Sequence, residues 1–516
     1  MSKPSALDDA TAAGVPRGAE YFRTDDLLDG IGRRSARGGA YTFASSALNF
    51  AVTTVTTVLI TRELTDEDFG LYGMVIVFAG FAGMFADLGL SRAVVQKPQI
   101  KHEQVSTLFW INLAIAGGLA IVLAASTPWI VALYDEPRLV PINFAMAALF
   151  LVHALGRQHK ALLERRMEFG RINAIAAITT PLGAMTGLVV AILGGGYWAL
   201  VTIPAATAIA SSASLWLACS WIPGLPRRGT GVREMLAFGA NVTGFQVINY
   251  FARNADNAML GYAWGAGPLG LYTRAYSLMM LPAQKVNTPL TGVVVPALSR
   301  LAEDHERYRR AFRRVVGLAA TLTTPLIALG IVLSPELIPL VLGEKWAPMT
   351  PVFIALSGAA LHAATNAVGG WVALSLGLPQ RMFRLSIVTA PLSVIAMAIG
   401  LQWGPLGVAI AVSAWQLLAK IPGFIYITRG TFLSVRDLLV PIAFPTLASL
   451  SGCAAAVCLR LAVDSFADDP GTTLIVGVKT AGYVGTLALL TVFTPAGRAT
   501  LGTIRTIRTT LRGSPG

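Results

Sequence analysis

The sequence predicts an all-α integral membrane protein, from its composition, its apolar windows and the placement of its basic residues. Hydrophobic residues make up 54% of the 516 and charged residues only 13%, with a mean hydropathy of +0.62. Soluble chains carry about 25% charged residues. We therefore expect most of the chain to lie in a membrane.

Fourteen apolar windows are each long enough for a helix to cross the hydrocarbon core. They cover residues 40–61, 70–91, 105–126, 139–159, 172–193, 197–219, 234–259, 268–295, 316–341, 350–375, 384–402, 406–428, 438–461 and 471–493. The sequence therefore predicts fourteen transmembrane helices.

The basic residues collect on one side of this predicted topology. With the N-terminus in the cytoplasm, 31 of the 40 Lys and Arg residues fall in cytoplasmic segments. Those on or near the outer side are Arg62, Arg138, Lys345, Arg460 and Lys479. This asymmetry follows the positive-inside rule and puts both termini in the cytoplasm. The net charge of +13 then needs no nucleic-acid partner, although basic loops also favour anionic membrane lipids.

The two halves of the chain resemble each other at an offset of 200 residues. Gly70-Leu71-Tyr72 corresponds to Gly270-Leu271-Tyr272, and Asn49 corresponds to Asn249. Six is an even number of helices, so two six-helix lobes would have the same orientation, with a substrate path between them. The predicted organisation is a polar cytoplasmic extension (1–38), an N-lobe (39–222), a C-lobe (223–430), two further helices (431–495) and a basic cytoplasmic tail (496–516).

Polar side chains fall on one face of several predicted helices. At 100° per residue, Gln246, Asn249, Arg253 and Asp256 share an arc of the seventh span, and Arg274 and Lys285 share one of the eighth; Asn49 lies on a polar face of the first. Lipid cannot satisfy such faces, so they must point at protein or water. The sequence predicts one net-cationic cavity built from these residues, with Lys420 and Asp87 as additions.

Each of these charges also has a structural interpretation. Arg253 and Asp256 can neutralise each other as an i, i+3 pair. Arg274 can extend to the outer interface, and Asp87 can form an interfacial salt bridge. Lys285 lies roughly 22 Å along the helix from Gly270, too deep for that, so it favours a cavity.

The charged stretch 300–314 also allows two interpretations. It is interpreted as a solvated helix that sets topology, with phosphate docking as the alternative.

No motif indicates an enzyme. The chain has no Gly-Lys-Ser/Thr phosphate loop, and its histidines and cysteines form no metal-ligand spacing. We expect no metal and no cofactor. Asp87 and Asp256 are the candidates for coupling to an ion gradient.

Several short motifs resemble those of one transporter family. They are 69–73 (FGLYG), 85–96 (FADLGLSRAVVQ), 159–169 (HKALLERRMEF), 254–261 (NADNAMLG), 270–276 (GLYTRAY) and 295–301 (VPALSRL). Over about residues 38–440 the chain resembles the polysaccharide transporter family of the multidrug/oligosaccharidyl-lipid/polysaccharide (MOP) superfamily. The resemblance implies two six-helix lobes in a V, alternating access, and a cationic cavity for a polyprenyl-diphosphate-linked oligosaccharide. Asp256 and Arg274 lie in the matching motifs.

The expected function is therefore a flippase of the inner membrane that supplies cell-surface polysaccharide synthesis beside a polymerase. Arg253, Arg274 and Lys285 would attract the diphosphate. Asn49, Gln246 and Asn249 would contact sugar hydroxyls, and Asp256 and Lys420 complete the predicted substrate site. The alternatives are a cation-coupled multidrug exporter of the same superfamily, a membrane-embedded glycosyltransferase, and a non-transporting scaffold.

Overall fold

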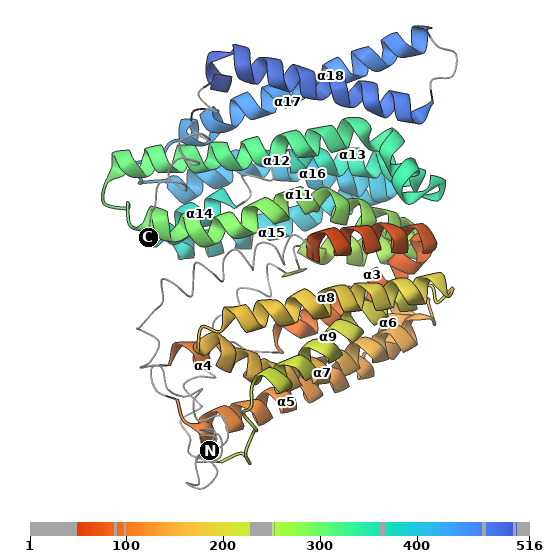
Figure 1. Ribbon diagram of the computed structural model, residues 1–516, viewed down its shortest axis with the longest axis vertical. Helices are drawn as coiled ribbons and strands as arrows, with labels where there is room; N and C mark the ends of the chain where they lie inside the picture. The colour runs from red at the N-terminus through yellow and green to blue at the C-terminus, as the bar shows by residue number, and fades with distance from the viewer. Residues whose placement is uncertain are drawn as a thin grey trace, which may run out of the picture. The chain divides into compact units, whose positions relative to one another are not determined.

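The computed structural model of the protein describes residues 49–86, 90–97, 100–227, 250–361, 367–466, 471–498 and Gly502, apart from Ala252. Within these residues every regular element is a helix (Figure 1). Nine helical segments of this part of the chain are long and apolar enough to cross a membrane, and one of them, Pro379–Thr428, contains two helices. The prediction of an all-α membrane protein is confirmed. The number fourteen remains a prediction, because the windows 40–61 and 234–259 lie partly outside the described residues.

The chain forms two compact units, Met1–Gly267 (unit 1) and Pro268–Gly516 (unit 2). The lobe boundary predicted from the sequence lies earlier, at 222/223. Because residues 228–249 lie outside the described part of the chain, the predicted boundary stays a prediction.

Unit 1 consists of the helical segment 49–63, a run of helices from α3 to α9, and the helical segment 250–264. The helices are α3 (Asp66–Met84), α4 (Leu90–Gln96), α5 (His102–Ala125), α6 (Thr127–Tyr134), α7 (Leu139–Arg165), α8 (Phe169–Ile192) and α9 (Trp198–Ala218). The span predicted over 70–91 corresponds to α3, which begins four residues earlier and ends seven residues earlier. α3 ends at Met84, where the N–H groups of Phe85 and Ala86 bond the carbonyls of Ala82 and Gly83 in a tightened last turn.

A capping box begins α3. The Thr65 hydroxyl accepts a hydrogen bond from the Asp68 N–H at 3.2 Å, and the Asp68 carboxylate accepts one from the Thr65 N–H at 2.9 Å. Three acidic residues occupy the first turn, where the helix dipole favours negative charge. This start is therefore specified by the local sequence.

The segment 250–264 and Ala266, which follows it, each pack against α3. The Tyr250 hydroxyl donates to the carbonyl of Val77 at 2.7 Å and lies against Gly80. Gly70 meets the backbone of Ala266 so closely that a Cβ there would overlap it. Small residues thus allow the backbones to approach, as is common between membrane helices.

Unit 2 contains the remaining helices. They are α11 (Ala266–Ser299), α12 (His305–Leu342), η3 (Glu344–Met349), α13 (Thr350–Ala360), α14 (Val368–Ser375), α15 (Pro379–Gly400), η5 (Leu401–Trp403), α16 (Gly404–Thr428), α17 (Val435–Phe466) and α18 (Thr472–Phe493). The first two residues of α11 lie in unit 1. The starts of α3 and α11, at 66 and 266, keep the 200-residue spacing seen in the sequence.

α12 and α17 lie side by side in parallel (Figure 1). Arg313 bonds Asp437 and Arg460 bonds Glu336, each across a separation of 124 residues. Between these contacts Gly317 lies against Pro441. The two helices therefore keep one register over their shared length.

Pro335 inside α12 leaves the carbonyl of Ile331 without its usual helical donor. Ser334 donates to that carbonyl at 2.8 Å, a replacement of the kind that makes proline tolerable in a membrane helix. Tyr483 of α18 donates to the carbonyl of Pro325 at 2.9 Å, and this bond attaches α18 to α12.

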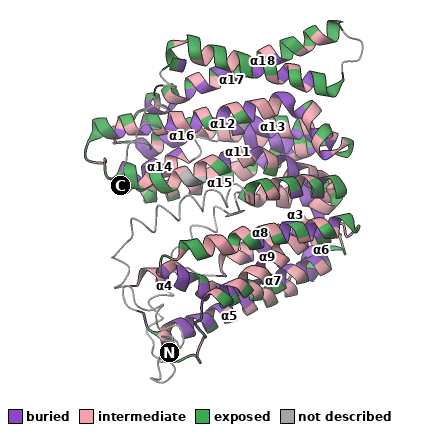
Figure 2. Cartoon of the chain, viewed as in Figure 1, coloured by how far each residue is buried: buried purple, intermediate pink, exposed green. Residues whose placement is uncertain are grey.

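Exposed residues form faces on the outer helices, as Figure 2 shows for α8, α15 and α18. On α15 this face is apolar and includes Ile387, Val388, Ile395 and Ile399. An exposed apolar stripe of this length on a helix that can cross a membrane is a lipid-facing surface.

We expect Gly183→Ala to destabilise the protein. α8 packs on α9 through Gly183, where a Cβ would lie 2.7 Å from the backbone carbonyl of Ile203 and would overlap Thr207. Overpacking of this kind costs about 1–3 kcal/mol. The measurement is thermal unfolding in detergent, with Gly118→Ala in α5 as the control because nothing lies within 4 Å of a Cβ there. Equal midpoints for the two variants would contradict close packing of α8 on α9.

Candidate functional site

α11 carries two of the predicted site residues on one continuous helix of unit 2. Arg274 is buried, with 7% of its surface exposed, and Lys285 is exposed. They are 11 residues apart, which is about 16 Å along the axis and only about 20° around it. The 34 residues of α11 include no Asp or Glu, so this face carries positive charge without a carboxylate on the same helix.

The segment 250–264 carries two more predicted residues, in unit 1. Arg253 is exposed, whereas Asp256 is buried at 4% exposure. The Asp256 carboxylate accepts a hydrogen bond from the Asn257 N–H at 2.8 Å. Among the residues that the structure describes, no ion pair joins Arg253 to Asp256. The structure therefore does not show the i, i+3 ion pair that the sequence allowed.

The remaining predicted residues are divided between the two units. Asn49 is partly buried in unit 1, where its side-chain oxygen has no hydrogen-bond partner within the described part of the chain. Lys420 is partly buried on α16 of unit 2. Gln246, Asn249 and Asp87 lie outside the described residues. The shared cavity therefore stays a prediction.

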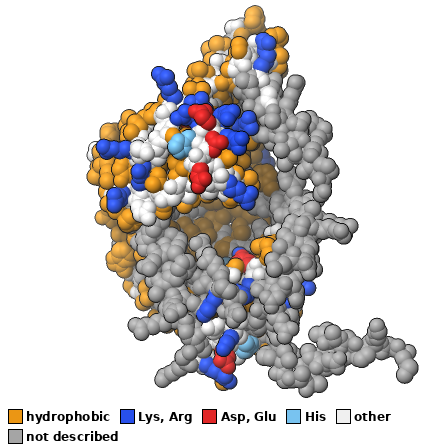
Figure 3. Space-filling model, turned by 90° about the vertical axis from the view of Figure 1, so that its left-hand side faces the viewer, with side chains coloured by type: hydrophobic (Ala, Val, Ile, Leu, Met, Phe, Trp, Pro, Cys, Tyr) orange, Lys and Arg blue, Asp and Glu red, His pale blue; other side chains and the backbone are white. Residues whose placement is uncertain are grey.

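One end of unit 2 carries a concentration of arginines that we call the arginine end. It is the end where α12, α15 and α17 begin. Its described basic side chains are Arg300, Arg307, Arg309, Arg310, Arg313, Arg314, Arg381, Arg384, Arg429, Arg436 and Arg498. Figure 3 looks onto this end and shows Lys and Arg side chains grouped around acidic side chains and histidine.

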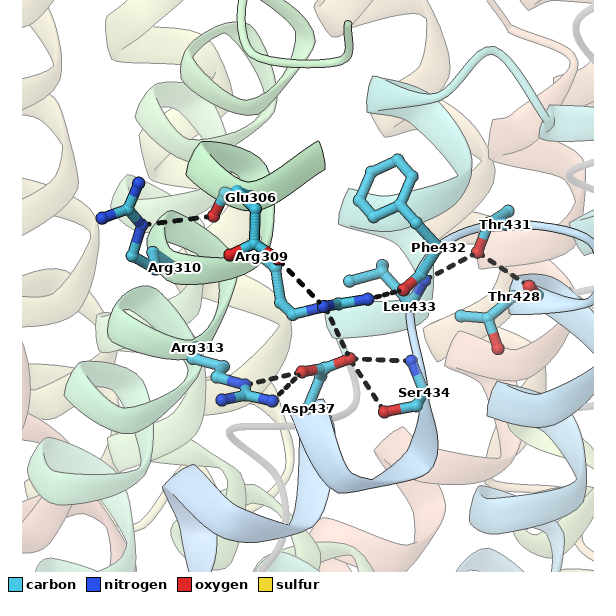
Figure 4. Close-up of polar contacts among 10 residues, drawn as sticks. All are labelled: Glu306, Arg309, Arg310, Arg313, Thr428, Thr431, Phe432, Leu433, Ser434 and Asp437. Atoms are coloured by element: carbon cyan, nitrogen blue, oxygen red, sulfur yellow. Dashed lines mark hydrogen bonds and ion pairs between the residues drawn. The ribbon is translucent and has the colours of Figure 1, made fainter. Parts of the chain in front are cut away.

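Asp437 is the buried centre of the arginine end (Figure 4). Its side chain is 0% exposed and bonds Arg313 at 2.5 Å, with Arg309 at 3.5 Å. Its second oxygen accepts from the N–H and hydroxyl of Ser434, at 2.8 and 2.9 Å. Asp437 thus caps the start of α17 and holds it on α12. We call this set the Asp437 node.

A second buried ion-pair cluster, the Glu336 node, lies at the opposite end of unit 2. Lys479 of α18 bonds both oxygens of Glu336 at 2.7 Å, and Arg460 of α17 bonds the same carboxylate at 2.9 Å. The Lys479 ammonium also donates to the carbonyl of Val332 at 3.1 Å. The side chains of Lys479 and Glu336 are only 8% and 11% exposed. Three helices therefore meet at one compensated charge cluster.

Sequence reasoning assigned Lys479 to the outer surface and missed both nodes. The topology argument counted only Lys and Arg, so the carboxylates of Glu336 and Asp437 were not considered as partners. The sequence signal that could have indicated these nodes is a charged residue within or beside an apolar window, because such a charge needs a partner. Which partner it finds depends on contacts more than 120 residues away in the chain.

Unit 1 has an acidic end with its own ion pairs. Arg138, which precedes α7, bonds Glu136 and also Glu67 of α3, both at 2.6 Å. The hydrogen bond from Arg138 holds the pKa of Glu136 below its usual range. These exposed pairs connect α3 to the loop before α7, and they contribute little energy in water.

Comparison with known proteins points to polysaccharide synthesis. Residues 39–351 match the family described as polysaccharide biosynthesis protein. The lipopolysaccharide biosynthesis protein WzxC of Escherichia coli K12 is 24% identical over 394 residues, which is 75% of this chain and 79% of that protein. The succinoglycan biosynthesis transport protein ExoT of Rhizobium meliloti is 25% identical over 317 residues, 61% of this chain and 64% of that protein.

A solved structure with the same fold is the lipid II flippase MurJ in an inward closed conformation. The TM-score is 0.68 at 15% sequence identity, covering 87% of this chain and 98% of that chain. At this identity the similarity shows the fold alone.

We expect Lys479→Met to destabilise unit 2 by on the order of 3 kcal/mol, because it leaves part of a buried carboxylate's charge uncompensated. The measurement is thermal unfolding in detergent. The control is Lys160→Met, which breaks the exposed pair of Lys160 with Glu164, 53% and 35% exposed, and should cost less than about 1 kcal/mol. Equal losses in the two variants would show that the Glu336 node is not a buried cluster.

Proposed function

We propose, because the chain belongs to the polysaccharide biosynthesis protein family, that it is a flippase. It moves a polyprenyl-diphosphate-linked oligosaccharide across the membrane by alternating access. The sugar is used for cell-surface polysaccharide, and no covalent bond of the cargo changes. The protein is a transporter and not an enzyme.

The charge of α11 is the observation that supports an anionic cargo. A charged side chain at the centre of a membrane helix costs about 2.5–3.5 kcal/mol on insertion scales. α11 carries Arg274 and Lys285 with no carboxylate along its 34 residues. We infer that a helix with this net positive charge attracts a negatively charged cargo.

The chemistry of these two side chains suits a diphosphate. The guanidinium of Arg274 presents a planar fork of donors that matches phosphate oxygens, and the ammonium of Lys285 acts as a point charge. Within this proposal Arg253, Asn49, Gln246, Asn249, Asp256 and Lys420 belong to the same substrate path. The prenyl tail stays in lipid, because its transfer to water would expose a large apolar surface.

The orientation follows from the arginines. We place the arginine end of unit 2 on the cytoplasmic side, in keeping with the positive-inside rule, so that both termini are cytoplasmic in the inner membrane. A polysaccharide polymerase would then take the cargo on the outer side. A cation-coupled multidrug exporter is disfavoured, since it would need a cavity that is acidic on balance and α11 carries no carboxylate.

We expect Arg274→Gln and Lys285→Met each to reduce cargo translocation at least tenfold. Each change removes a cation that contacts the diphosphate, and tenfold corresponds to about 1.4 kcal/mol. The measurement is flipping of a polyprenyl-diphosphate oligosaccharide in proteoliposomes that contain equal amounts of folded protein.

The control for this assay is Lys345→Met. Lys345 is an exposed cation of η3, outside the α11 face, so its loss should leave translocation unchanged. Wild-type rates for both α11 variants would remove the proposed site.

A further inference from the structure

The arginines at the start of α12 fall into two sets. Arg309 and Arg313 reach towards Asp437, whereas Arg310 points away from it (Figure 4). Arg307, Arg310 and Arg314 are exposed, and their spacing of three and four residues puts them within an arc of about 60°. We call these three the arginine stripe.

The arginine stripe has few partners in the described part of the chain. Arg307 pairs with Asp304 at 3.2 Å, but the two side chains are 71% and 47% exposed, so that pair is weak. Arg310 donates only to the backbone carbonyl of Glu306, at 3.4 Å. Arg314 has no hydrogen-bond or ion-pair partner among the described residues. The stripe therefore presents guanidinium groups outward from a helix that the Asp437 node holds in place.

The choice of arginine is not explained by topology. The positive-inside rule counts Lys and Arg alike, yet every described basic side chain at the arginine end is an arginine. The basic end of unit 1, where α7 ends and α8 begins, uses Lys97, Lys101 and Lys160 beside its arginines. Arginine differs from lysine in binding phosphate with two parallel hydrogen bonds. The exposed arginines at this end can therefore match the geometry of a phosphate as well as its charge.

α12 is long enough for the stripe to lie at the level of lipid headgroups when Glu336 lies at the opposite edge of the hydrocarbon core. Arg314 and Glu336 are 22 residues apart, which is about 33 Å along the helix, and the hydrocarbon core is about 30 Å thick. With α12 close to the membrane normal, Arg314 lies at the edge of the core. Arg310 lies about 6 Å further out, where lipid phosphates are found, and Arg307 about 10 Å out.

We propose that the arginine stripe binds the phosphate headgroup of an anionic bilayer phospholipid. Arg310 and Arg314 hold the phosphate oxygens and Arg307 contacts the outer part of the headgroup. The bound lipid fixes the height of α12 in the membrane, and through the Asp437 node it fixes α17 as well. This site is separate from the α11 face and does not rest on the identity of the transported cargo.

A phospholipid suits the stripe better than a soluble anion does. The stripe lies at the depth of the bilayer's own phosphates, so the lipid is present at high local concentration, and negative surface potential adds about 1 kcal/mol for each nearby basic residue. One and two turns after Arg314, Leu318 is partly exposed and Leu322 is 44% exposed, so a ligand with acyl chains can contact both the guanidinium and these apolar side chains.

The test is thermal unfolding of the full-length protein in neutral detergent, titrated with phosphatidylglycerol. We expect a saturable rise in the midpoint for the wild type and none with phosphatidylcholine or inorganic diphosphate. The Arg307→Lys, Arg310→Lys and Arg314→Lys triple variant keeps the charge but loses the bidentate geometry. We expect its half-saturating phosphatidylglycerol concentration to rise about tenfold.

The control changes three arginines of unit 1 that already have carboxylate partners. Arg166 and Arg171 pair with Glu168, and Arg227 pairs with Glu103, so their triple change to lysine should leave the lipid response as in the wild type. If the triple lysine variant of the stripe unfolds at a lower temperature than the wild type without lipid, the single variant Arg310→Lys is tested in its place. We expect its half-saturating phosphatidylglycerol concentration to rise about threefold.

Two results would overturn this site. One is a half-saturating phosphatidylglycerol concentration equal to that of the wild type, measured on the lysine variant of the stripe that remains folded without lipid. The other is a midpoint rise with inorganic diphosphate, or with polyprenyl diphosphate but not phosphatidylglycerol, which would assign the stripe to a soluble anion or to the cargo. Neither result depends on translocation, so the flippase proposal is tested separately.

Discussion

Compensation of buried charge at two levels of the membrane governs unit 2. The Asp437 node and the Glu336 node are separated by 23 residues on both α12 and α17, which is about 34 Å along each helix. Sliding one helix by a single turn would strip both carboxylates of their partners, and an uncompensated buried charge costs several kcal/mol. One register therefore satisfies both ends together, and the position of α18 follows because Lys479 belongs to the same cluster.

The nodes show how charges hold the fold of unit 2. Asp437 and Glu336 bind the side chains that face them, and these contacts connect helices. The 34 residues of α11, which carry Arg274 and Lys285, include no carboxylate, and within the described residues Arg307 is the member of the arginine stripe that has a carboxylate partner, the exposed Asp304. We propose anionic lipids for these two places, the cargo at α11 and a bilayer lipid at the stripe.

Family membership and the charges of α11 support the same function. The family match covers residues 39–351, while the cationic face belongs to a single helix within that region. MurJ shows that the fold exists in a lipid flippase, although at 15% identity it says nothing about individual residues. The cargo proposed for this chain therefore depends on Arg274 and Lys285 rather than on the fold.

The membrane class and most of the helices of this protein could be predicted from the local sequence. Hydropathy is a property of a local window, so the membrane class and the helices α5, α7, α8, α9 and α15 to α18 follow from the local sequence. The end of α3 at Met84 was not predicted, because the window 70–91 is apolar apart from Asp87 and Ser91. The partners of Lys479 and Asp437 could not be foreseen either, since they lie 143 and 124 residues away. Which charges are compensated is decided when distant helices pack, because the energy of a buried charge depends on its neighbours in space.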